Sequence, residues 1–239
     1  MKRILILTGA TLVAFAASAR EILYVGATGG SWQTIGNWVN RETEQPITEL
    51  WDGDVACFNP GENVSLEVVN NASGVLNFGG IKVLSGAVTV SGWNNMHFFL
   101  DSGALDVAEG ASLVIDGYIW SKGAAWEYSD CVFRKSGKGR ATVRGSIGLD
   151  KGGNNHRLPY LYVDEGSLVV EKNAAAQGNF KQSVITELAV KSGASFVANV
   201  DDAMLASAQV TMKYLRIGPR VGSNISLNGW AGSRDDLPR

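Results

Sequence analysis

The sequence predicts an all-β fold in which the chain coils into a solenoid of stacked parallel strands, and three observations lead to this expectation. The 239 residues include 29 glycines but only 5 prolines. Valine, leucine, serine and threonine fall in short runs separated by glycine, asparagine and aspartate, which is typical of many short strands joined by turns. One glycine-centred pattern also recurs along the chain. A β-sandwich with similar turns is the alternative all-β fold.

Five glycines share one environment, with apolar residues five and three positions before the glycine and a valine four positions after it. They are Gly86, Gly103, Gly110, Gly166 and Gly193. Alternating apolar positions on both sides of a glycine indicate two strands with inward faces, joined by a tight corner. Closely spaced corners without an Asn-Gly hairpin signal favour a chain that coils into rungs of about 17 to 28 residues.

The first nineteen residues have the features of a secretory signal peptide. Lys2 and Arg3 precede an apolar run over 4–16 and three small residues at 17–19. The run is shorter than the roughly 20 apolar residues that cross a bilayer. We therefore expect an exported mature chain that begins at Arg20, has no integral membrane segment, and resides in the periplasm, at the cell surface or outside the cell.

The expected mature chain is mildly acidic. The sequence has 21 basic and 23 acidic residues, and removing Lys2 and Arg3 leaves a formal charge of −4. A nucleic-acid partner would favour a basic face, so this balance argues against one. The chain is long enough to bury roughly 70–75% of its unfolded surface without a disulfide framework. Whether Cys57 and Cys131 pair stays open, because the sequence does not supply the geometry of a bridge.

The segment 20–60 precedes the repeat, and we expect it to form an N-terminal cap. It contains three tryptophans. They are Trp32, Trp38 and Trp51. Such rings suit a platform that stacks on sugars, or a cover for the open end of a solenoid core, and we expect the cover because the rungs begin directly afterwards. Asp52 and Asp54 occupy alternate positions, as the ligands of a hard cation do, but "VACF" follows where a calcium loop would continue with further acids. We expect them to form a turn of the cap and predict no metal site.

Two stretches carry a resemblance to a known family: "GSWQTIGNW" at 30–38 and "WDGDVACF" at 51–58. Together with the repeat they resemble exported bacterial proteins with autotransporter-associated β-strand repeats, best over 22–115 and weakly over 161–200. The resemblance implies a passenger-like right-handed parallel β-helix. Autotransporters end in a membrane β-barrel, whereas this chain ends at "GWAGSRDDLPR". We expect either a free exported module or a shortened member of the group.

The segment at about 120–160 departs from the repeat and is expected to be an irregular loop insertion within a β-helix that spans 61–239. It combines aromatic side chains with gathered charges, which suits a projecting loop that binds an acidic glycan. The residues expected to bind a ligand there are Trp126, Glu127, Tyr128, Arg134, Lys135 and His156. A solvated loop whose charges only keep an edge soluble is the open alternative.

A polysaccharide lyase or hydrolase built on a β-helix is the enzymatic alternative. A hydrolase needs two carboxylates about 5 to 10 Å apart. Asp201 and Asp202 are adjacent, so on a strand they would point to opposite faces. We therefore expect a non-catalytic structural or adhesive module without a cofactor, and a glycan-binding module as the alternative. The expected partners are polysaccharide, cell-surface glycans or further copies of the chain.

Overall fold

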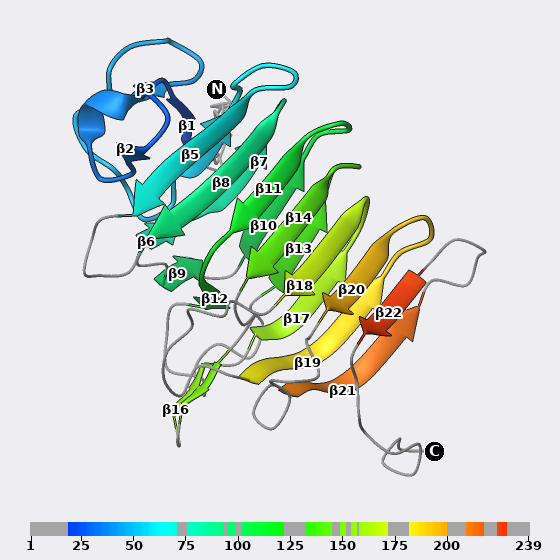
Figure 1. Ribbon diagram of the computed structural model, residues 1–239. Coiled ribbons are helices and arrows are strands. Elements are labelled where there is room, and N and C mark those ends of the chain that lie inside the picture. Colours follow the sequence, from blue (N-terminus) through cyan, green and yellow to red (C-terminus); the bar gives the residue numbers. More distant parts are fainter. Residues whose placement is uncertain are drawn as a thin grey trace, which may run out of the picture.

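Strands that recur along the chain stack on one another in parallel and build a β-solenoid (Figure 1). The computed structural model describes residues 19–70, 76–92, 95–98, 102–121, 132–144, 149–151, 154–156, 158–171, 182–199, 209–217 and 224–228. Within both long sheets every pairing is parallel except one at the N-terminal edge. A β-sandwich would need antiparallel sheets. The predicted all-β solenoid is therefore confirmed.

Two long sheets form the sides of the solenoid. Sheet A contains β1 (Glu21–Tyr24), β3 (Trp38–Asn40), β4 (Val55–Phe58), β7 (Gly80–Val83), β10 (Ser102–Val107), β13 (Val132–Ser136), β17 (Leu158–Val163), β19 (Gln182–Val190) and β21 (Gln209–Ile217). Sheet B contains β2 (Gly30–Ser31), β5 (Ser65–Asn70), β8 (Ala87–Gly92), β11 (Ser112–Ile115), β14 (Arg140–Arg144), β18 (Ser167–Glu171), β20 (Ser195–Asn199) and β22 (Asn224–Asn228). Both sheets follow chain order, apart from β3, which lies outside β1 at the N-terminal edge.

A third side closes the first turns of the solenoid. Its parallel strands are β6 (Leu76–Phe78), β9 (Asn95–Phe98) and β12 (Tyr118–Ser121). Each of these strands follows one strand of sheet A and one of sheet B, so three consecutive rungs have three sides. Later rungs extend sheets A and B. The remaining elements are the 3₁₀ turn η1 (Ile35–Asn37) and an antiparallel pair formed by β15 (Leu149–Lys151) and β16 (Asn154–His156).

The core is continuous because inward residues of successive rungs are register partners. In sheet A, Ile81 pairs with Leu105, and Val163 pairs with Val190. All four side chains are buried. Apolar residues therefore stack along the solenoid axis, and each rung buries the apolar surface that its neighbour would otherwise expose to water.

Most of the predicted corners lie where a strand of sheet A leads into a strand of sheet B. The corner glycines with positive φ are Gly86 (70°), Gly110 (79°), Gly166 (62°) and Gly193 (83°). Gly103 is not a corner: it lies inside β10 as the register partner of Phe133. A residue without a side chain beside a phenylalanine keeps the volume of that layer constant, so the local pattern is misleading at Gly103.

A further corner, Gly137, escapes the sequence pattern although its φ is 70°. The inward residues before it are Phe133 and Lys135, which stand four and two positions ahead of the glycine instead of five and three. This corner belongs to the rung formed by β13 and β14, which pair with the rungs on either side. Residues 132–144, inside the expected loop insertion, therefore form a regular rung.

Two corner glycines allow the steric and conformational roles of glycine to be separated. A Cβ at Gly166 would lie 2.4 Å from the carbonyl oxygen of Gly139, whereas a Cβ at Gly193 would have no heavy atom within 4 Å. We expect Gly193→Ala to lose only the roughly 1–2 kcal/mol of a left-handed alanine. Gly166→Ala should lose about 1–3 kcal/mol more through overpacking. Urea unfolding would measure both losses, and equal values would contradict the predicted clash.

Candidate functional site

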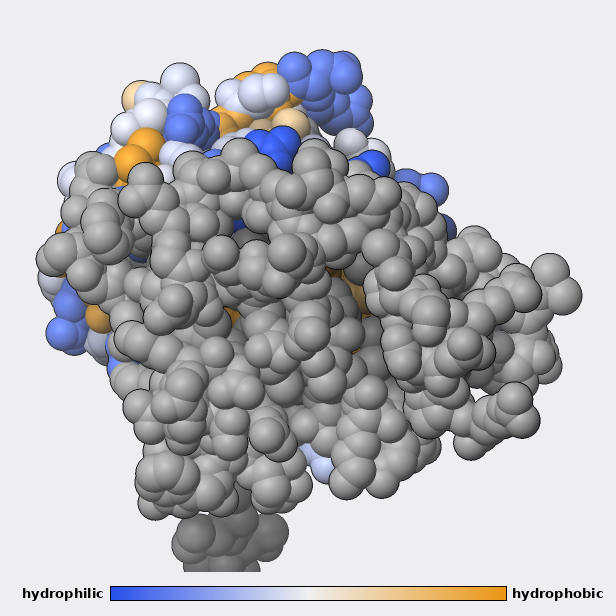
Figure 2. Space-filling view, turned by 60° about the horizontal axis from the view of Figure 1, so that its bottom comes forward, coloured by the Kyte–Doolittle hydropathy of each residue, from blue (hydrophilic) through white to orange (hydrophobic). Residues whose placement is uncertain are grey.

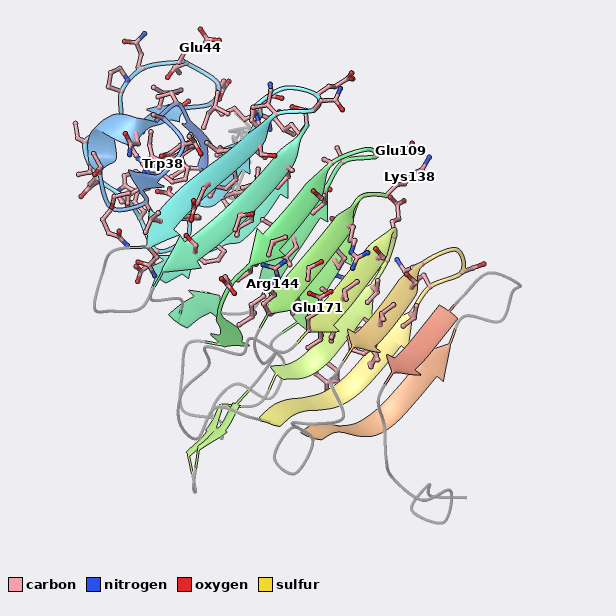
Figure 3. All side chains as sticks on the ribbon, in the orientation of Figure 1. Trp38, Glu44, Glu109, Lys138, Arg144 and Glu171 are labelled. Carbon is pink, nitrogen blue, oxygen red and sulfur yellow. The ribbon has the colours of Figure 1, made fainter. Side chains whose placement is uncertain are left out.

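The N-terminal end of the solenoid is closed by a cluster of aromatic side chains (Figure 3). The ring of Trp38 lies 5.1 Å from that of Trp32 and 5.1 Å from that of Tyr24, measured between centroids. Phe58 and Phe78 complete the cluster. Trp38 is 0% exposed and Trp32 3% exposed, and the indole N–H of Trp38 donates to the carbonyl oxygen of Trp32 at 2.8 Å. Neither ring offers a face to a sugar.

Chain topology explains why these rings meet. β1 pairs in parallel with β4 on one side and antiparallel with β3 on the other, so β3 covers the N-terminal edge of sheet A. The antiparallel register sets Tyr24 opposite Trp38. Aromatic rings at the end of a rung bury a large apolar area where no further rung would cover the core.

The third tryptophan of the segment, Trp51, has a different environment. It is 52% exposed, and the guanidinium carbon of Arg20 lies 3.8 Å from its ring centroid. Arg20 also makes two hydrogen bonds to the Asp54 carboxylate, Nε to Oδ1 at 2.7 Å and Nη2 to Oδ2 at 2.6 Å. Asp54 accepts the backbone N–H of Trp51 at 2.8 Å, and Asp52 lies exposed in this turn. Asp54 therefore acts as an anchor within a turn.

A second charged group covers the outward side of β4 next to the cap. Glu21 forms ion pairs with Arg41 and with Lys82. Burial of the Glu21 carboxyl opposes ionisation, but hydrogen bonds from Lys82 and Arg41 outweigh it and lower its pKa. The Cys57 thiol lies beneath, 0% exposed, and burial together with the charge of Glu21 raises its pKa to about 11. Such a thiol stays protonated at neutral pH and is a poor nucleophile.

Cys57 is a free thiol in the structure. Its possible partner Cys131 lies outside the described residues. Over the described ranges, no group of three or more His, Cys, Asp and Glu side chains is placed to hold a metal ion. In the same part of the chain, no helix is both long enough and apolar enough to cross a membrane.

Lys135 was expected to bind a ligand, but its side chain points into the solenoid and is 0% exposed. In sheet A it is the register partner of Leu105 and Val163, both core residues. Its ammonium donates to the carbonyl oxygens of Ser136 and Gly137, each at 2.6 Å, with the Glu165 carbonyl oxygen at 3.3 Å. Lys135 therefore satisfies main-chain acceptors at a shortened corner and is unavailable to a ligand.

The buried ammonium predicts a pH dependence of stability. Burial lowers the pKa of Lys135 from 10.5 to about 8, against the opposing charges of Asp106 and Glu165. Between these values the unfolded chain binds a proton that the folded chain has released, so this group stabilises the fold increasingly as pH rises. We expect the free energy of unfolding of the parent protein, relative to Lys135→Met, to rise between pH 8 and 10. A constant or falling difference in urea titrations would contradict it.

Among the other residues expected to form the ligand site, only Arg134 has a side chain that the structure describes. Trp126, Glu127 and Tyr128 lie outside the described residues. The backbone of His156 belongs to β16, but the structure does not describe its side chain. Arg134 is the exception: its side chain is 48% exposed on the outward face of sheet A and forms an ion pair with Asp164 at 2.9 Å.

Two tyrosines beside Arg134 were missed by sequence reasoning. Tyr160 and Tyr162 occupy alternate positions of β17, with the buried residues Leu161 and Val163 between and after them. Both therefore lie on the outward face of sheet A. The stretch "YLYV" contained this signal, because a strand that alternates tyrosine with aliphatic residues presents two aromatic rings on its solvent side.

Outward charges elsewhere link neighbouring rungs. Lys138 pairs with Glu109 at 3.3 Å between two corners, and Glu171 lies 3.5 Å from Arg140 and 3.6 Å from Arg144 (Figure 3). On the face in Figure 2, the described residues show small hydrophobic areas among hydrophilic ones. Together the stacked rungs, the sealed end and the paired outward charges define a parallel β-solenoid protein. Comparisons with protein-family models, curated proteins and solved structures find no match.

Proposed function

We propose that the chain is an exported, non-catalytic structural or adhesive β-solenoid module that acts at the bacterial cell surface or in the periplasm. The observation that carries the proposal is the apolar core shared by the described rungs: the inward residues Phe133, Leu161 and Leu188 are register partners on successive strands, and all three are buried. A solenoid filled in this way is a stiff support whose outward columns form an extended surface, which suits spacing and adhesion.

Three further features support this role. The buried aromatic cluster around Trp38 seals one end of the core, so this end needs no partner to cover it. Rung-to-rung ion pairs such as that of Lys138 with Glu109 keep the outer surface charged and soluble. The secretory features of residues 1–19 support export, and Arg20, the expected first mature residue, is anchored to Asp54.

Export and adhesion can be tested on the full chain. We expect the protein, produced in a Gram-negative host, to be recovered from the periplasm or cell surface with Arg20 as its first residue, as N-terminal sequencing would show. Beads coated with the purified protein should adhere to bacterial envelopes or to one another. A chain that stays in the cytosol with its first nineteen residues intact would overturn the proposal.

The enzymatic alternative needs a separate measurement. The proposal predicts no release of reducing sugar or of unsaturated product from a panel of polysaccharides. Glu127, Asp130 and His156 are titratable residues of the segment at 120–160. If the parent protein released either product, and a variant carrying Glu127→Gln, Asp130→Asn and His156→Gln did not, the protein would be an enzyme. The same triple variant should leave bead adhesion unchanged if the function is structural.

A further inference from the structure

Two parallel aromatic rings stand on the outward face of sheet A. The rings of Tyr160 and Tyr162 are parallel to within 6°, with centroids 6.4 Å apart, and both side chains are partly exposed. Their backbone belongs to β17, which is hydrogen-bonded to β13 on one side and to β19 on the other. β17 is thus an interior strand of sheet A, with a hydrogen-bonded strand on each side, and its backbone holds the two rings in fixed positions.

The two sides of Tyr162 differ. On β13 its register partner is Arg134, whose guanidinium carbon lies 4.7 Å from the ring centroid and covers one face of the ring. On β19 its register partner is Ala189, whose methyl group is too short to cover a neighbouring ring. On this side of β17 the register therefore sets a small residue beside Tyr162. An aromatic face beside a short side chain suits the apolar face of a pyranose ring.

Charged groups border these rings. The Asp164 carboxylate accepts from Arg134 at 2.9 Å and pairs with Lys191 at 2.6 Å. Its side chain is 14% exposed, whereas those of Arg134 and Lys191 are 48% and 64% exposed. Burial of the Asp164 carboxyl opposes ionisation, but hydrogen bonds from Lys191 and Arg134 lower its pKa. One inner carboxylate therefore orients two outer cations, and the group carries a formal charge of +1.

The same charge occurs elsewhere on the solenoid, in a group for which no contact with an aromatic ring is recorded among the described side chains. Arg140 and Arg144 flank Glu171 on the outward face of sheet B, again two cations and one carboxylate. The rings of Tyr160 and Tyr162, together with Arg134, Asp164 and Lys191, distinguish the sheet A surface, which we name the tyrosine face. The group on sheet B provides a control of equal charge.

We propose that the tyrosine face binds an acidic polysaccharide whose sugars carry carboxylate groups. The apolar face of a pyranose ring packs on Tyr162, and the sugar carboxylate takes the solvent-facing donors of Lys191 and Arg134, since charge-assisted hydrogen bonds of this kind are strong. The chain as a whole carries a formal charge of −2, and the acidic residue Glu187 is the register partner of Tyr160 on β19, so the attraction is confined to the donors of Lys191 and Arg134. The inference rests on the adhesive form of the proposed function and identifies the ligand class.

Binding of the purified full protein to polygalacturonate tests the proposal, with the methyl-esterified polymer as a matched ligand that keeps the sugars and lacks the charges. We expect the acidic polymer to bind at least tenfold more tightly. Tyr162→Ala should weaken binding at least tenfold, and Tyr162→Phe should retain it because the ring is what packs on the sugar. Lys191→Ala should reduce the preference for the acidic polymer. Arg144→Ala on sheet B should change neither value.

The outcomes separate this inference from the proposed function. Absence of binding to polygalacturonate and to hyaluronate, with bead adhesion intact, would overturn the ligand class alone. Equal affinity for a DNA fragment, or binding that survives both Tyr162→Ala and Lys191→Ala, would show that nonspecific charge or another surface is responsible and would also overturn it. Because Tyr162 and Lys191 lie at the surface, urea midpoints near the parent value will verify that each variant is folded.

Discussion

Replacing Asp54 by alanine is expected to lower the free energy of unfolding by about 3–5 kcal/mol, the usual cost of breaking a buried ion pair. The Asp54 side chain is 4% exposed and that of Arg20 17% exposed, so removal of the carboxylate leaves a guanidinium largely shielded from water. The variant also removes the acceptor of the Trp51 backbone N–H. Urea unfolding followed by circular dichroism measures the loss.

Two controls show whether burial is the cause. Glu109→Ala breaks the ion pair with Lys138. The side chain of Glu109 is 77% exposed and that of Lys138 is 65% exposed, so the free energy of unfolding should fall by no more than about 1 kcal/mol. Replacing both partners in Arg20→Met/Asp54→Leu should cost less than Asp54→Ala alone, because no unpaired charge remains. A loss for Asp54→Ala as small as that for Glu109→Ala would mean that the anchor contributes little to the fold.

Trp38→Ala is expected to lower the free energy of unfolding by about 3–5 kcal/mol, as for other large buried aromatic residues. Trp38 is 0% exposed and contacts the rings of Tyr24, Trp32 and Phe58, so its removal leaves a cavity at the sealed end. Trp38→Phe should cost less, since a ring remains while the hydrogen bond to Trp32 is lost. Thermal and urea unfolding provide the comparison.

Trp51→Ala is the matched tryptophan control. Trp51 is 52% exposed and contributes one ring face to Arg20, so about 1 kcal/mol is expected. If Trp38→Ala and Trp51→Ala were equally mild, the cluster would not be a structural cap. The opposite interpretation, a sugar platform, requires exposed rings at Trp32 and Trp38, which the structure does not show.

The fold could be predicted because its signals are local. Alternation of apolar residues on both sides of Gly86, Gly110, Gly166 and Gly193 depends only on neighbours in sequence, and the positive φ at each corner is a property of glycine itself. The same logic failed at Gly103, where a glycine inside a strand produces the same local pattern as a corner. It also failed at Lys135, because the pattern assigns inward positions to apolar residues and Lys135 is a charged residue at an inward position.

The sequence by itself determined that this protein is built from short strands and glycine corners that coil into a solenoid with an aromatic N-terminal segment. Only the tertiary structure decided which residues of different rungs meet: Lys135 between Leu105 and Val163, and Tyr162 between Arg134 and Ala189. The physical reason is register. The number of residues between rungs varies, so hydrogen bonding between stacked strands, and not spacing along the chain, sets the partners that make a core or a binding surface.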